Sequence, residues 1–70
     1  MKIHYKDKEA FNLLVIVSGY THSALSEKIG KSRPYINKSI SRGIIGADAA
    51  RKLTEVLESN FDEIFEVRED

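Results

Sequence analysis

Two short apolar segments that meet at one glycine constrain the fold of this 70-residue chain more than any other feature. Before Gly30, Thr21 can cap a helix over residues 22–29, in which Leu25 and Ile29 stack one turn apart. Gly30 then ends this helix, because glycine accepts the left-handed backbone that other residues avoid. We therefore expect two consecutive short helices joined by a tight turn.

The second helix of this pair is predicted to begin directly after the turn. Ser32 is its expected N-cap, and Pro34 fits the first turn because an amide hydrogen there has no intrahelical acceptor. Ile36 and Ile40 give the helix an apolar stripe that faces the core. Ser26 must be small, because the two helices cross closely at its position in the first helix. Together these features predict a helix-turn-helix.

Three more helices are predicted outside this pair. Asp7 can cap the first, which runs to Ser18, and the helical spacing of apolar residues predicts another from Asp48 to Ser59. Asn60, followed three residues later by a glutamate, matches a capping box that opens a short last helix. Helices therefore account for most of the expected structure.

The remaining segments are predicted to lack regular structure. Residues 1–6 alternate Ile3 and Tyr5 with polar side chains, which fits either a short edge strand or an extended arm, and we take the arm as the prediction. Residues 41–46 are expected to form a loop, and residues 66–70 to fray. The expected fold class is all-α: one compact five-helix domain over residues 1–70, with a helix-turn-helix at about residues 21–41 and a short N-terminal arm.

Size and composition disfavour several classes of protein. A chain of this length buries roughly 60% of its surface on folding, which leaves little room for a deep catalytic cavity, so an enzyme is not expected. The absence of cysteine suits a reducing compartment and predicts a cytoplasmic location. The longest apolar run, residues 13–17, is far short of the ~20 residues that span a bilayer, and no charged-then-apolar leader opens the chain. Neither a membrane protein nor a secreted protein is therefore expected. His4 and His22 have no second ligand at metal-binding spacing, so neither a metal nor a cofactor is expected.

The formal net charge is zero, but the charges are unevenly distributed. Residues 1–20 carry a net charge of +1, residues 21–50 carry +3 and residues 51–70 carry −4. A basic segment of this size is most often a solvated face, and an acidic end is usually ordinary wet surface. Charge alone therefore leaves both a nucleic-acid interface and a protein interface open.

Apolar and aromatic side chains outside the helical stripes allow two interpretations. Tyr5 and Tyr20 are expected to pack with their hydroxyls kept in water. The C-terminal part is rich in large apolar groups, which form either core or a dimer or partner interface. These groups are Ile44, Ile45, Phe61, Ile64, Phe65 and Val67.

Two stretches carry a resemblance to a known family. Residues 21–30 (THSALSEKIG) and 32–36 (SRPYI) match a pattern of small-polar, leucine, alanine, glycine and serine-arginine positions, and residues 61–65 (FDEIF) match an apolar-Asp-Glu-apolar-Phe ending. Over about residues 8–66 the chain resembles the Cro and phage-repressor-like helix-turn-helix family, also called the xenobiotic-response-element type. Lys31 and Ser39 depart from it, because both occupy positions that are usually apolar in the family.

The resemblance implies a lambda-repressor-like DNA-binding domain whose second motif helix enters the major groove. In that case Arg33 contacts guanine and Asn37 contacts adenine, while nearby lysines and arginines bind phosphate. His22 stands where the family often has a glutamine that touches a phosphate. The complete set of predicted DNA-binding residues is Ser32, Arg33, Pro34, Asn37, Lys38, Ser41, Arg42, Lys28, Lys31 and His22.

Two functions follow as expectations. The first is a phage-type transcriptional regulator that binds double-stranded operator DNA as a homodimer, with half-sites ~34 Å apart, in the cytoplasm of a bacterial or phage-infected cell. The second is an antirepressor that keeps this fold but captures a partner phage repressor through its acidic and apolar C-terminal half. Zero net charge and Lys31 in the turn favour the second function.

Overall fold

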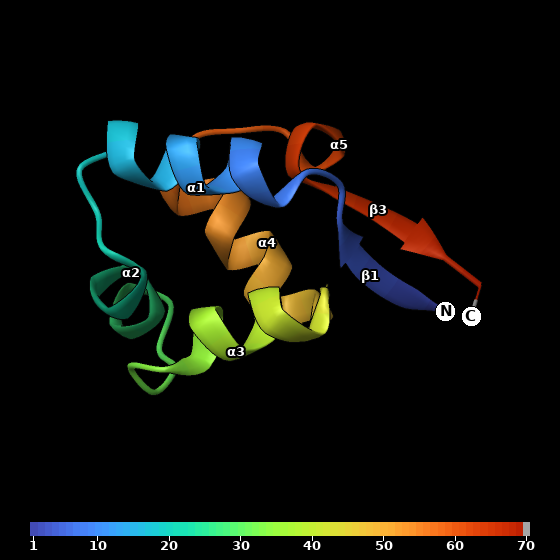
Figure 1. The fold of residues 1–70 in the computed structure, drawn as a ribbon, viewed down its shortest axis with the longest axis horizontal. Coiled ribbons are helices and arrows are strands. Elements are labelled where there is room, and N and C mark those ends of the chain that lie inside the picture. Colours follow the sequence, from blue (N-terminus) through green and yellow to red (C-terminus); the bar gives the residue numbers. More distant parts are fainter. Residues whose placement is uncertain (70) are drawn as a thin grey trace.

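A three-stranded antiparallel sheet closes one end of a bundle of helices (Figure 1). The computed structural model describes residues 1–69. Its strands are β1 (Lys2–Tyr5), β2 (Ile44–Ile45) and β3 (Phe65–Arg68). Its helices are α1 (Lys8–Val17), α2 (His22–Lys28), α3 (Tyr35–Arg42), α4 (Ala47–Val56) and α5 (Phe61–Ile64).

The all-α prediction is therefore wrong, and the fold is a mixture of helix and sheet. Residues 2–5 are not a loose arm but the central strand, in the order β2-β1-β3. Ile3 pairs with Ile45 on one side and with Val67 on the other. The predicted loop at 41–46 contains β2, and the predicted frayed end contains most of β3; Asp70 lies outside the described residues. The sheet forms because pairing satisfies the backbone amides and carbonyls of three extended segments that are remote in sequence.

The predicted helix starts are mostly confirmed by their caps. The Asp7 carboxylate accepts a hydrogen bond from the Ala10 amide at 3.1 Å, and the Thr21 hydroxyl accepts one from Ala24 at 3.1 Å. Asn60 opens α5 with the expected capping box. Ser32 does not cap α3, because its carbonyl instead accepts from the amide of residue 35 in a turn that precedes the helix.

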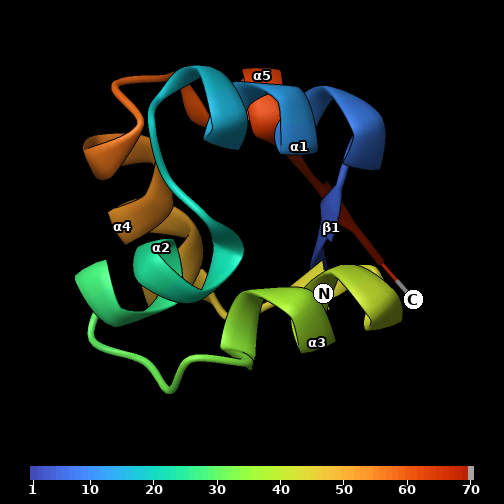
Figure 2. The ribbon, with the colours of Figure 1, turned by 60° about the vertical axis from the view of Figure 1, so that its left-hand side comes forward.

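The core lies where the helices meet the sheet. In Figures 1 and 2, α1 and α5 lie along one side, α2 and α3 along the other, and α4 between them. Tyr5 packs against Phe11 and Phe65, with ring centroids 5.0 and 5.3 Å apart. The buried apolar residues are Tyr5, Phe11, Val15, Leu25, Ile29, Ile36, Ile45, Ala49, Ala50, Leu53, Leu57, Ile64 and Phe65.

Most of the apolar C-terminal residues thus belong to the core. Ile45, Ile64 and Phe65 are buried, whereas Val67 on the outer strand is 54% exposed. None of the helices within residues 1–69 has the length and apolar character needed to cross a membrane.

Candidate nucleic-acid interface

The turn between α2 and α3 has the geometry that the sequence predicts. Gly30 has a φ of +80°, the left-handed conformation in which a side chain is strained. The Lys31 amide donates to the Ser26 carbonyl at 2.9 Å, and this bond closes the end of α2. The chain can therefore reverse within a few residues and lay α3 across α2.

Ser26 stands at the crossing of the two helices and has no exposed surface. Its hydroxyl donates to the His22 carbonyl at 2.8 Å and accepts from the Ile36 amide at 3.1 Å. The prediction that this position must be small is confirmed, because the backbone of α3 lies within hydrogen-bond distance of its side chain. The same contact satisfies an amide at the start of α3 that has no partner within the helix.

Helix α3 separates its side chains into a buried face and an exposed face. Ile36 and Ser39 are buried and Ile40 is half-buried. On the opposite side and in the preceding turn, seven of the predicted DNA-binding residues are all exposed: Ser32, Arg33, Pro34, Asn37, Lys38, Ser41 and Arg42. We call these seven residues the α3 face; it contains three basic side chains and no acidic one.

One acidic side chain lies at the border of the α3 face. Glu27 on α2 is 4.0 Å from the Arg33 guanidinium, and both side chains are more than half exposed. An exposed pair at this distance contributes little and is screened by salt. The Arg33 guanidinium is therefore available to another ligand.

A buried polar contact fixes the inner side of α3. The Ser39 hydroxyl donates to the Ile36 carbonyl at 2.8 Å and lies 2.7 Å from the Tyr5 hydroxyl. Because the single Ser39 proton is used within the helix, the Tyr5 hydroxyl donates to Ser39. Burial raises the pKa of Tyr5 to about 12. The expectation that the Tyr5 hydroxyl remains in water is wrong, because this hydroxyl is buried against Ser39.

Two predicted site residues are engaged elsewhere. The Lys31 ammonium lies 3.4 Å from the Asp48 carboxylate at the start of α4 and 5.3 Å from the centroid of the Tyr35 ring. It holds the pKa of Asp48 below its usual range by hydrogen bonding and by charge. His22 is half-buried, and its Nε2 lies 2.9 Å from the Asn12 side-chain oxygen. Lys31 and His22 therefore pack between helices, whereas Lys28 is exposed at the end of α2.

Lys8, which the sequence reasoning missed, adds positive charge beside the α3 face. Its Nζ lies 4.0 Å from the position that a Cβ on Gly43 would take, directly after the last residue of α3. A cation there interacts favourably with the carbonyl end of the helix. Only tertiary packing reveals this neighbour, because α1 and α3 are separate in sequence.

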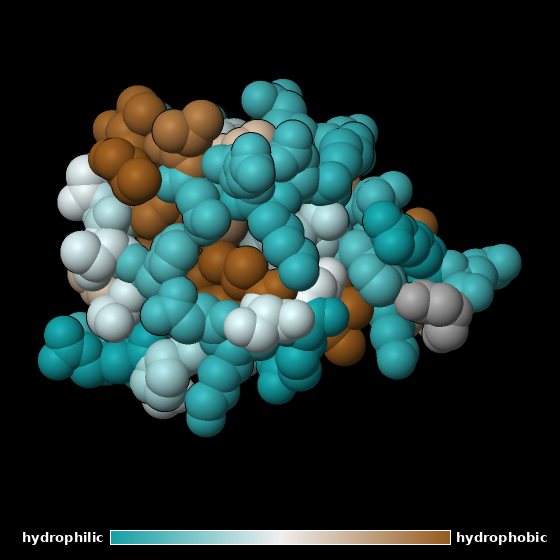
Figure 3. All heavy atoms as spheres, in the orientation of Figure 1, coloured by the Kyte–Doolittle hydropathy of each residue, from teal (hydrophilic) through white to brown (hydrophobic). Residues whose placement is uncertain are grey.

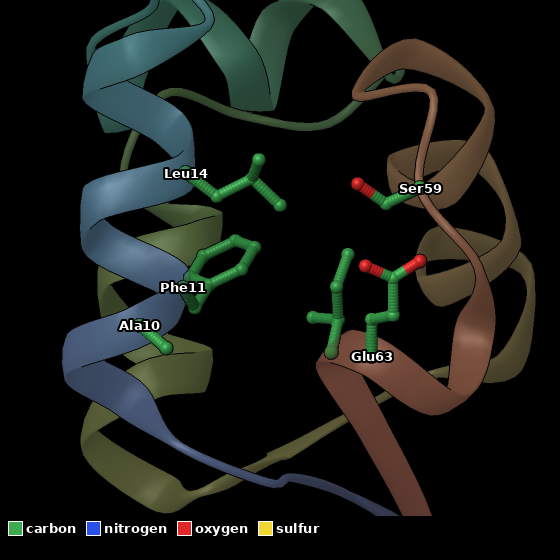
Figure 4. Close-up of a pocket in the computed structure, with 6 residues that line it drawn as sticks. Ala10, Phe11, Leu14, Ser59 and Glu63 are labelled. Atoms are coloured by element: carbon green, nitrogen blue, oxygen red, sulfur yellow. The ribbon is translucent and has the colours of Figure 1, made fainter.

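A pocket with a volume of about 220 Å³ lies between α1 and the start of α5 (Figure 4). Phe11 and Leu14 face Ser59 and Glu63 across it. The Glu63 carboxylate already accepts the Asn60 amide at 3.2 Å, as part of the capping box. Within residues 1–69 the structure contains no cluster of three or more histidine, aspartate or glutamate side chains that could bind a metal ion.

Comparisons with protein-family models, with curated proteins and with solved structures find no match to this chain. The geometry of the chain itself is therefore the basis for assigning a function. That geometry provides a packed helix pair with one exposed basic face.

Proposed function

We propose that this protein is a small DNA-binding regulator that reads operator DNA with the α3 face. The observation that carries the proposal is the division of α3: its buried side is held by Ser26 and Tyr5, and its exposed side has three bases and no acid. A helix fixed on one side and basic on the other can enter a major groove without rearrangement of the fold.

The distribution of charge supports this orientation. Asp62 and Glu63 lie on α5, across the molecule from α3 (Figure 1). A DNA polyanion is attracted to the α3 face and repelled from the opposite side, so a net charge of zero does not oppose binding. The protein would approach DNA in one orientation.

The side chains of the α3 face divide into two roles under this proposal. Arg33 and Asn37 are suited to base edges, because a guanidinium binds guanine and an amide binds adenine through paired hydrogen bonds. Lys38 and Arg42 are suited to phosphates, together with Lys8 beside them. An eight-residue helix reads only a few base pairs, so a regulator of this kind acts as two copies on a palindromic site. Its expected location under this proposal is the cytoplasm of a bacterial or phage-infected cell.

The experiment begins with selection of bound duplexes from a random DNA pool, followed by band-shift titration of the enriched sequence. Arg33→Ala and Asn37→Ala are each expected to weaken binding by roughly 5- to 150-fold, the effect of losing one bidentate base contact. Lys38→Ala is expected to reduce the slope of log affinity against log salt by about 0.9.

Arg51→Ala is the matched control, because Arg51 is an exposed base on α4, outside the α3 face, and pairs with Glu55. Its binding should equal that of the unmodified protein. Failure to enrich any sequence, or an Arg33→Ala effect no larger than that of Arg51→Ala, would contradict the proposal and favour the protein-capturing alternative.

A further inference from the structure

From residue 13 to residue 17 every side chain of helix α1 is apolar, but the fold covers only one side of this stretch. Phe11 and Val15 on the inner face are at most 2% exposed. Leu13, Ile16 and Val17 are 63, 69 and 80% exposed, and their i, i+3, i+4 spacing places them together on the outer side. We call these three residues the α1 outer face. A stretch of helix that is apolar on every side is normally buried on every side, so this face lacks a cover in the single chain.

The space-filling view locates this feature. In Figure 3, apolar side chains gather at the upper left, over the C-terminal end of α1. Beside them lies a hollow of about 360 Å³ lined by Asn12, Val15, Ile16, Tyr20, Thr21 and His22. Ile16 belongs both to the α1 outer face and to the wall of the hollow. The projecting aliphatic side chains therefore lie next to a recess that can receive one of them.

The electrostatics of the segment restrict what can cover it. Residues 10–26 contain no Asp, Glu, Lys or Arg, although the whole chain has 22 such residues. A partner with charged side chains at this contact would lose their hydration and find no opposite charge in return. A second copy of the chain presents the same stretch without charged side chains, and the same projecting side chains next to the same recess. Such self-complementarity is what a two-fold symmetric interface requires.

We propose that two copies of this protein associate through the α1 outer face, with Leu13 or Val17 of each copy entering the hollow of the other. The purpose of the dimer rests on the proposed function, in which two helix-turn-helix units act together. In Figures 1 and 2, α1 and α3 lie on different sides of the molecule, so this contact leaves the α3 face free. Three projecting side chains make a small contact compared with the ~20–30 residues that each partner contributes to a standard interface. We therefore expect a dissociation constant (Kd) of the dimer of roughly 10 to 500 µM.

Sedimentation equilibrium of the purified protein without DNA, from about 10 µM to 1 mM, tests the proposal. The unmodified protein is expected to dimerise with rising concentration. Added salt should not weaken the dimer, because apolar contacts are not screened. Ile16→Glu and Val17→Glu should each weaken it by at least ~30-fold, the effect of burying an unpaired carboxylate. Both residues are exposed in the single chain, so the fold should be retained, with circular dichroism as the check.

Ala47→Glu is the matched control, because it adds the same charge at an exposed position in the first turn of α4. It should leave the dimer unchanged. The proposal is overturned if the unmodified protein stays monomeric at 1 mM, or if the dimer survives Ile16→Glu. Loss of the dimer on Val67→Glu alone would also overturn it, because the interface would then be the free edge of β3. All of these measurements are made without DNA. Absence of the dimer is therefore distinguishable from absence of DNA binding.

Discussion

Removal of the Tyr5 hydroxyl tests how α3 is held on the sheet. In Tyr5→Phe, Ser39 keeps its bond to the Ile36 carbonyl but loses the donor that lies 2.7 Å away. Loss of a buried neutral hydrogen bond costs about 1 to 2 kcal/mol, which for a domain of this size lowers Tm by roughly 5 to 15 °C. Urea unfolding followed by circular dichroism at pH 8 measures the change in free energy.

A double-mutant cycle isolates the contact itself. Ser39→Ala leaves the buried Tyr5 hydroxyl without this partner and should cost about 1 to 3 kcal/mol. The double variant should cost less than the sum of the single variants by about 1 kcal/mol, because the second change removes a group that has already lost its partner. Additive effects would show that the two hydroxyls do not interact.

The pH dependence provides an independent check. Burial raises the pKa of Tyr5 from 10 to about 12, so the folded state holds this proton more tightly than the unfolded state. The corresponding stability is fully present below pH 10 and is lost as the pH rises towards 12, by about 2 to 3 kcal/mol. Tyr5→Phe lacks this component, so the stability advantage of the unmodified protein should shrink above pH 10. Parallel pH profiles, or a Tyr5→Phe effect below about 0.3 kcal/mol at pH 8, would refute the reasoning.

Three further outcomes are expected. Gly30→Ala should destabilise the fold by about 1 to 2 kcal/mol in urea unfolding. The whole cost should come from backbone strain, because an added Cβ meets nothing within 4 Å. Gly46→Ala, at a negative φ, should cost less, and equal costs for the two variants would contradict the assignment of strain to Gly30. Ser26→Val should cost about 2 kcal/mol or more, because it removes the acceptor for an α3 amide and overfills the crossing; a neutral result in thermal unfolding would show that the helices can separate there. Lys31→Ala should raise the pKa of Asp48 towards its ordinary value in a carboxyl NMR titration. An unchanged titration would show that the ion pair does not form in solution. The ion pair stabilises the folded state at pH values above the pKa of Asp48 in the unfolded chain, and this stabilisation is lost as the pH falls through the lowered pKa of the folded state.

Local chemistry was sufficient to predict where three of the helices begin. Asp7, Thr21 and Asn60 cap helices with their own side chains or backbone, and these contacts reach only three residues along the chain. The α3 face follows from helical periodicity in the same way, because residues spaced by one turn share a side wherever the helix lies. Ser26 was predictable because the crossing of two adjacent helices depends on a short segment.

The sequence by itself determined where α1, α2 and α5 begin, which side of α3 is polar and where the chain reverses, because all of these depend on neighbours a few residues apart. Only the tertiary structure decided that Ile3 pairs with both Ile45 and Val67, that Tyr5 donates to Ser39 and that Lys31 turns to Asp48. Strands of two to four residues carry too weak a periodic signal to be recognised alone, and they form when partners forty or more residues away complete their hydrogen bonds. For the same reason the sequence could indicate a basic surface but could not say which of its charged side chains would be exposed and which would contact other helices.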